Sequence, residues 1–165
     1  MIENMLKINA ERPKFQALFQ ANLFDHWMEI KGSSLFPKKQ DFRPQKFSKV
    51  LGQLAIVTTN QDGTFSDRLT GSTICDTLLM GQREQKLTVS SDLNINSLLH
   101  TMLDEARDAA EPMYFTGSFT PVSRPSVEYS LLTTPFCGSD ENSLGYLLLA
   151  FDFTKQAHEE LFAIS

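Results

Sequence analysis

The chain has 165 residues and a formal net charge of −5, and this length suits one domain with a substantial core. Its hydrophobic content of 41% and charged content of 21% match globular proteins and exclude extensive disorder. The acidic balance opposes nucleic-acid binding, because phosphate neutralisation requires clustered Lys and Arg. The only basic cluster, from Lys38 to Lys49, is short, and we interpret it as a solvated face.

The two cysteines, Cys75 and Cys137, lie far apart in the sequence and have no C-x-x-C or histidine-rich spacing. Neither a zinc site nor a disulfide framework is therefore predicted. No apolar segment approaches the roughly 20 residues that span a bilayer. The first residues lack the pattern of a secretory signal. We expect a cytoplasmic protein without a membrane partner.

The N-terminal third is predicted to be helical after a loose arm or short helix that extends to Arg12. Apolar residues then recur at three- and four-residue steps, which predicts an amphipathic helix that ends at Gly32. These residues are Phe15, Leu18, Phe19, Leu23, Trp27 and Ile30. A polar passage between Pro37 and Pro44 cannot be an uninterrupted helix, and a short helix is predicted from Pro44 to Leu51.

Five main extended segments are expected in the rest of the chain. Residues 53–59 and 64–71 flank a turn and predict a hairpin. Residues 113–120, 126–133 and 144–153 predict an antiparallel meander, and residues 87–89 are a further short candidate. The apolar run 144–151 does not alternate, so both faces of this strand should be covered, as in a central strand.

Three further helices are predicted from capping residues and apolar periodicity. Ser72 or Thr73 can begin a short helix to Met80. Asn94 can cap a longer helix with one apolar face, and Thr154 can cap a last helix. The apolar face of the longer helix consists of Ile95, Leu98, Leu99, Met102, Leu103 and Ala106.

Three stretches resemble, in order, successive motifs of a family of single-domain bacterial PAS-like proteins. They are WMEIKG at 27–32, PKKQDFRP at 37–44 and FSDRLTGS at 65–72. The family shows a Trp followed by Leu and Gly, a Pro-x-Arg-x-Asp-apolar-x-Pro stretch, and a Tyr-Arg-Leu-x-Gly-Thr strand. The similarity covers about residues 23 to 153. Asp67 replaces an aromatic residue, Ser72 replaces Thr, Lys39 replaces Arg, and the family's Gly-x-acid-x-x-Gly turn is missing after Gly81.

The resemblance and the element order together imply an α+β fold with a PAS-like five-stranded antiparallel sheet. Helices are expected on one face of the sheet, and the N-terminal helical preface on the other. The expected division is an arm and preface start at 1–22, a PAS-like domain at 23–153 and a C-terminal helix at 154–165. The family implies a sensory or interaction module, often dimeric, that binds a small molecule or a signalling partner protein.

In PAS domains a small molecule lies between the inner face of the sheet and the helices. Strand alternation places Leu69 on the side of Phe65 and Asp67, with Arg68 on the other side. Tyr129 and Tyr146 stand out because a buried phenol needs a hydrogen-bond partner. The alternative is an ordinary packed core. The candidate pocket residues are Leu69, Cys75, Leu98, Met102, Phe115, Tyr129, Leu131, Tyr146 and Leu148.

The residues expected to have structural or interface roles are Trp27, Asp41, Arg68 and Gly71. Trp27 should anchor the preface helix on the sheet, with a dimer interface as a second hypothesis. Arg68 should form an ion pair with Asp41 or Glu29, and Gly71 should act as the hinge between strand and helix.

Two alternatives to a ligand sensor remain. One is a protein–protein adaptor with a filled core, and the other is a small α+β enzyme that uses the same cavity. The enzyme is disfavoured because His26, His100 and His158 lie on separate predicted helices and none is next to a nucleophile motif. No cofactor is identified, since His100, the one candidate haem ligand, is predicted on the polar side of its helix.

Overall fold

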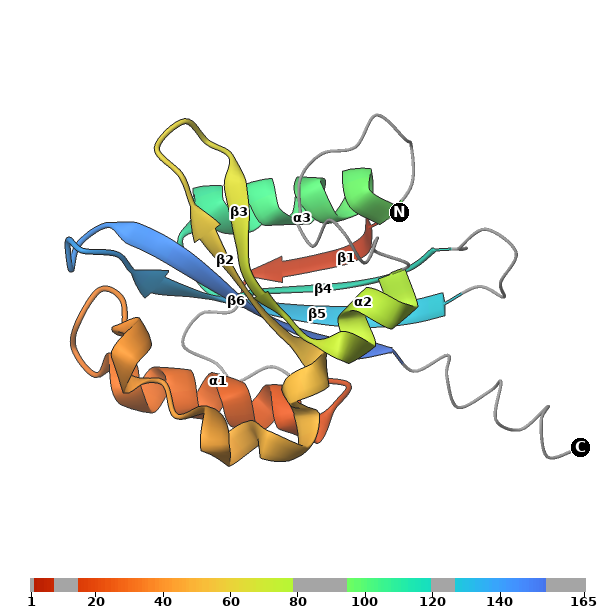
Figure 1. Ribbon diagram of the computed structural model, residues 1–165, viewed down its shortest axis with the longest axis horizontal. Coiled ribbons are helices and arrows are strands. Elements are labelled where there is room, and N and C mark those ends of the chain that lie inside the picture. The colour runs from red at the N-terminus through yellow and green to blue at the C-terminus, as the bar shows by residue number, and fades with distance from the viewer. Residues whose placement is uncertain (1, 8–14, 79–94, 120–126, 154–165) are drawn as a thin grey trace, which may run out of the picture.

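The computed structural model describes residues 2–7, 15–78, 95–119 and 127–153. Within these ranges, six strands form one antiparallel sheet in the order β1-β4-β5-β6-β2-β3 (Figure 1). The strands are β1 (Ile2–Lys7), β2 (Leu54–Thr59), β3 (Phe65–Thr70), β4 (Met113–Phe119), β5 (Val127–Cys137) and β6 (Leu144–Phe153).

Helices cover both faces of this sheet. The helix α1 and the segment η2 lie on one side of the strands, and α3 lies on the other side (Figure 1). The helical elements are α1 (Leu18–Lys31), the 3₁₀ segments η1 (Lys39–Asp41) and η2 (Pro44–Gln53), α2 (Ser72–Leu78) and α3 (Ile95–Ala109).

The strand β6 contributes to two separate apolar cores, which explains its unbroken apolar sequence. Leu147, Leu149 and Phe151 pack with residues of α2 and α3 in what we call the α3-side core. Leu148 and Ala150 pack with Leu23, Phe24 and Trp27 of α1, among others, in the α1-side core. Alternate residues of one strand thus enter opposite layers, as the two-residue period of a strand requires.

Two polar side chains attach α1 to the sheet. The amide of Gln20, fully buried, donates from Nε2 to the carbonyl oxygens of Ser130 at 3.3 Å and Ala150 at 3.0 Å. Its Oε1 accepts from the Ser130 hydroxyl at 3.2 Å. The Trp27 indole, 4% exposed, donates from Nε1 to the Pro135 carbonyl oxygen at 2.8 Å. Trp27 is therefore the predicted anchor, and its burial against the sheet does not fit the dimer-interface hypothesis.

The predicted fold class is confirmed: the five expected PAS-like strands, the helical face and the preface helix on the opposite face are all present. The expectation for the first residues was wrong, because residues 2–7 form β1 and pair with the edge of β4. Backbone hydrogen bonds hold this short strand, and six residues carry little periodicity. The candidates at 87–89 and after Thr154 lie outside the described residues, and the domain division stays a prediction.

The buried Gln20 amide yields a stability prediction. Gln20→Leu approximately preserves the side-chain size. It leaves the buried carbonyl oxygens of Ser130 and Ala150 without the Nε2 donor, and the Ser130 hydroxyl without the Oε1 acceptor. We expect a loss of about 2 kcal/mol in the free energy of unfolding, measured by urea denaturation. The control Gln16→Leu changes an exposed side chain just before α1 and should stay within about 0.5 kcal/mol of the parent. Equal losses in the two variants would contradict this role of Gln20.

Candidate functional site

A β-bulge at Arg68 sets the geometry of the sheet edge. Ile56 pairs with Leu69 while the next residue, Val57, pairs with Asp67, so Arg68 has no partner residue on β2. One extra residue reverses the side-chain alternation beyond it. Leu69 therefore lies on the α1 side of the sheet and is 61% exposed. The prediction that Leu69 points inward with Phe65 was wrong for this reason.

The reversed side chain of Leu69 lines an apolar groove of about 590 Å³. The groove lies between the 3₁₀ segments and the hairpin of β2 and β3. Its floor includes Leu54, Ile56 and Leu148, which belong to or pack against the α1-side core. The complete lining is Lys39, Gln40, Phe42, Pro44, Leu51, Gly52, Leu54, Ala55, Ile56, Leu69, Gly71, Ser72 and Leu148.

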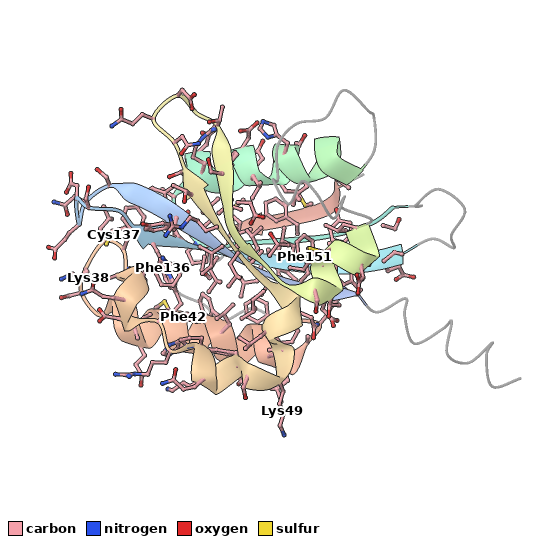
Figure 2. The ribbon with its side chains drawn as sticks, viewed as in Figure 1. Lys38, Phe42, Lys49, Phe136, Cys137 and Phe151 are labelled. Atoms are coloured by element: carbon pink, nitrogen blue, oxygen red, sulfur yellow. The ribbon has the colours of Figure 1, made fainter. Side chains whose placement is uncertain are left out.

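Aromatic packing holds one wall of the groove against the sheet. Phe42 stacks on Phe47 with ring centroids 5.7 Å apart and meets Phe136 of β5 edge-on at 6.1 Å. Figure 2 shows Phe42 and Phe136 on the α1 side of the sheet. Phe47 is buried, so the stack ties both 3₁₀ segments to the α1-side core. These aromatic contacts therefore hold the wall against the sheet, although the wall comes from a stretch that prolines interrupt.

A backbone contact between two glycines closes the end of the groove. The Gly71 amide donates to the Leu54 carbonyl oxygen at 2.9 Å, and Gly71 lies directly on η2. A Cβ at Gly71 would collide with the Gly52 carbonyl group and lie 2.6 Å from the Leu51 oxygen. Only glycine permits this approach. Gly71 lies between β3 and α2, where this tight contact makes it a fixed junction, so the structure does not support the predicted hinge.

The glycine contact predicts a graded mutational effect. Gly71→Ala should lower the free energy of unfolding by about 2–3 kcal/mol, because the new methyl group meets backbone atoms that cannot move separately. Gly52→Ala should cost less, since its Cβ would lie 2.7 Å from Oγ1 of Thr73, a side chain that can rotate. Urea denaturation of both variants checks the order, and a larger loss in Gly52→Ala would refute it.

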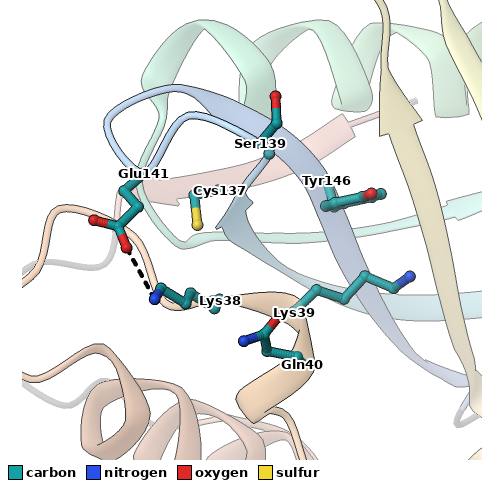
Figure 3. A pocket seen from close by; sticks show the side chains of 8 residues that line it. Lys38, Lys39, Gln40, Cys137, Ser139, Glu141 and Tyr146 are labelled. Carbon is teal, nitrogen blue, oxygen red and sulfur yellow. Dashed lines mark ion pairs between the residues drawn. The ribbon is translucent and has the colours of Figure 1, made fainter.

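A more polar hollow of about 560 Å³ adjoins the groove. The Cys137 amide donates to the Pro37 carbonyl oxygen at 3.0 Å, which places Lys38 and Lys39 beside the end of β5. Lys38 Nζ forms an ion pair with Glu141 at 2.9 Å, whereas Lys39 Nζ lies 4.9 Å from the ring centroid of Tyr146 (Figure 3). The hollow is lined by Lys38, Lys39, Gln40, Cys137, Gly138, Ser139, Glu141 and Tyr146.

The predicted pocket between α3 and the sheet is occupied by its own side chains. Met102, Phe115 and Leu131 have no exposed surface, and Tyr129 is 1% exposed. The Tyr129 hydroxyl donates to Met102 Sδ at 3.7 Å, so the buried phenol has a partner within the chain. Leu98 packs at the margin of this core. These residues behave as the packed-core alternative describes.

The other pocket candidates do not join that core. Tyr146 and Leu148 lie on the α1 side of the sheet, so placing them on the same wall as Tyr129 was wrong. Leu148 instead lines the groove and Tyr146 the hollow. Cys75 is half-buried on α2 outside both cores, and burial, then Asp67 and then Asp76, raise the pKa of its thiol.

The predicted ion pair of Arg68 does not form. Arg68 is exposed, and it is not within ion-pair distance of Asp41 or Glu29. The Glu29 carboxylate lies 3.8 Å from Lys46 Nζ and 3.7 Å from His26 Nδ1. The bulge accounts for the error, because it breaks the alternation on which the placement of Arg68 depended.

His26 occupies a separate hollow beside α1 and is 5% exposed. Its Nε2 accepts a hydrogen bond from the Arg43 amide at 3.2 Å, so this nitrogen carries no proton. Burial, and then the charge of Lys46, lower the pKa of His26, whereas Glu29 opposes the shift and Arg43 adds slightly to it. His26 is thus a neutral structural acceptor that fixes the chain just after η1.

The lowered pKa of His26 predicts acid sensitivity. Below about pH 6.5 the His26 side chain of the unfolded protein binds a proton, whereas folded His26 stays neutral until the pH falls to its lowered pKa. Stability should therefore fall as the pH decreases from 6.5 to the folded pKa, by at most about 1.4 kcal/mol per pH unit. His26→Gln should flatten this slope in urea denaturation between pH 7.5 and 5.5. Glu29→Gln should extend the loss to lower pH, and an unchanged slope in His26→Gln would contradict the assignment.

Sequence reasoning missed most of the groove, although two of the three motif stretches line it. Lys39, Gln40, Phe42 and Pro44 come from stretch 37–44, and Leu69, Gly71 and Ser72 from stretch 65–72. The convergence of these stretches was the available signal. It was overlooked because the pocket was expected on the α3 side.

The chemistry of the described residues offers no metal centre. No group of three or more His, Cys, Asp or Glu side chains gathers within the described ranges. His100 lies 3.3 Å from the Asp104 carboxylate and meets the Phe65 ring edge-on. His158 lies outside the described residues. Among the helices that the structure describes, none has the length and apolar character to cross a bilayer.

Comparisons with known proteins identify the family of this chain. A family model described as PAS domain matches residues 16–148, so the chain belongs to the PAS domain family. The PAS domain from Bordetella pertussis BvgS is structurally similar, with 16% sequence identity and a TM-score of 0.45. That match covers 73% of this chain and 92% of the other. No curated protein matches. Family membership supports a sensory or signalling module.

Proposed function

We propose that this PAS domain is a sensory module that binds a small, largely apolar molecule in the groove between the 3₁₀ segments and the hairpin of β2 and β3. The observation that carries the proposal is a concave apolar surface of about 590 Å³, within the range of ligand pockets. Two leucines that line the groove are unusually exposed, Leu69 by 61% and Leu51 by 46%. The core on the opposite face of the sheet is filled by side chains. Burial of these side chains by a ligand would be favourable.

The lining supports binding without catalysis. Among the described residues that line it, the polar side chains are Lys39, Gln40 and Ser72, and none of these lining residues is a carboxylate or a histidine. General acid–base or nucleophilic catalysis requires such groups within hydrogen-bond reach of one another. A cytoplasmic location in a bacterial cell, and output through a homodimer or a partner protein, remain predictions that accompany this proposal.

A route for the signal starts at Gly71. An occupant that presses on Leu69 or η2 acts on the Gly52–Gly71 contact, and α2 begins at the next residue. The α2 residues Ile74 and Leu78 are buried in the α3-side core. Occupancy on one face can thus shift the packing of the other face.

The groove predicts a specific binding defect. Nile red, a neutral apolar dye, should bind to the parent protein with increased fluorescence. Leu69→Gln should weaken this binding by about tenfold, because one apolar wall of the groove becomes polar. The control Leu18→Gln changes a 76% exposed leucine of α1 that does not line the groove. Circular dichroism should show both variants folded. Equal affinity in the parent and Leu69→Gln would refute the groove as the binding site.

The filled α3-side core also favours the adaptor alternative, in which exposed Leu69 on the edge strand β3 contacts protein. Native mass spectrometry distinguishes the two proposals. A copurified small molecule lost in Leu69→Gln supports the sensor, whereas a ligand-free homodimer that Leu69→Gln dissociates supports the adaptor.

A further inference from the structure

We infer that the occupant of the groove is an amphiphilic anion, whose apolar body lies against Leu69 and whose carboxylate binds Lys39. The inference rests on the proposed function and adds the chemical class of the ligand. Lys39 and Gln40 are the two residues that line both the apolar groove and the polar hollow, so they mark the junction of the two spaces. A molecule with one apolar part and one charged end matches this arrangement.

The two neighbouring lysines differ in whether a carboxylate neutralises their charge. Lys38 Nζ is paired with Glu141 at 2.9 Å, while no carboxylate of the described chain lies within ion-pair distance of Lys39 Nζ. Their side chains extend in opposite directions, Lys38 toward Glu141 and Lys39 along the Tyr146 ring (Figure 3). Lys39 therefore presents an ammonium group without a counter-ion at the end of an apolar surface.

The ring of Tyr146 holds this ammonium in place. Lys39 Nζ lies 4.9 Å from the ring centroid, within the range of cation–π attraction. An aromatic face attracts the cation without neutralising it, so the ammonium keeps its capacity for an anion. Lys39 is half-buried, which reduces the entropy lost when a ligand fixes the side chain.

Desolvation decides between an anionic and a neutral occupant. Because Lys39 lines both spaces, an apolar molecule that reaches their junction would displace water from its side chain, and a charge that loses water without gaining a partner is destabilised. A carboxylate replaces the lost hydration with a charge-assisted hydrogen bond. The Gln40 amide, at the same junction, can donate a second hydrogen bond. A cationic occupant would be repelled by Lys39.

The test compares two ligands of equal chain length, decanoate and decanol, by displacement of Nile red from the full chain. Decanoate, kept below micelle formation, should displace the dye at about tenfold lower concentration than decanol. Lys39→Met should abolish this preference, and Lys39→Arg should keep it. The matched control Lys49→Met removes an exposed lysine that lines neither the groove nor the hollow, and it should also keep the preference.

The outcomes separate this inference from the proposed function. Equal displacement by decanoate and decanol in the parent, or a preference that survives in Lys39→Met, overturns the anionic ligand but leaves the groove as a binding site. Dye binding that does not depend on Leu69 overturns the proposed function itself. If Lys39→Met does not fold, loss of the decanoate preference in Lys39→Gln supports the inference, and its retention overturns it.

Discussion

Burial of β6 on both faces is the constraint on which the rest of the structure depends. A strand in the middle of the sheet, with successive residues in opposite cores, needs a covering layer on each side. The α3-side layer is held to the sheet mainly by the packing of apolar side chains. The α1-side layer must also satisfy polar groups, and Gln20 and Trp27 do so with hydrogen bonds to β5 and β6. The apolar groove lies beside this second layer, and no residue of α1 lines it.

Two backbone irregularities turn that edge into a groove. The bulge at Arg68 moves Leu69 to the α1 side, and the contact of Gly71 with Gly52 brings η2 against the end of the hairpin. A regular hairpin would have sent Leu69 toward α3, and a side chain at Gly71 would have held η2 away. The groove therefore results from one extra residue and one missing side chain.

The same two features mark the limit of sequence-based prediction here. The strands β2 to β6, α1, α3 and both covering layers follow from periods of two and of three to four residues, whereas the six residues of β1 are too few to show such a period. The side of Leu69 did not follow, because a single bulged residue inverts the alternation and leaves no compositional trace. For β6 the limit was different: a strand buried on both faces gives no indication of which face borders a cavity. Tyr146 and Leu148 were thus assigned to the wrong face, and they border the hollow and the groove on the α1 side.

The position of the groove also bears on how a sensory signal would leave the domain. The strand β3 has Leu69 on one face and Phe65 on the other, and Phe65 lies beneath the Arg107 guanidinium of α3, 5.3 Å from the ring centroid. Arg107 also donates to the Gly63 carbonyl oxygen in the turn before β3. If an occupant of the proposed groove displaced β3, the displacement would reach α3 through these direct contacts. Because β3 is an edge strand, paired only with β2, it can move with less disruption of the sheet than any central strand.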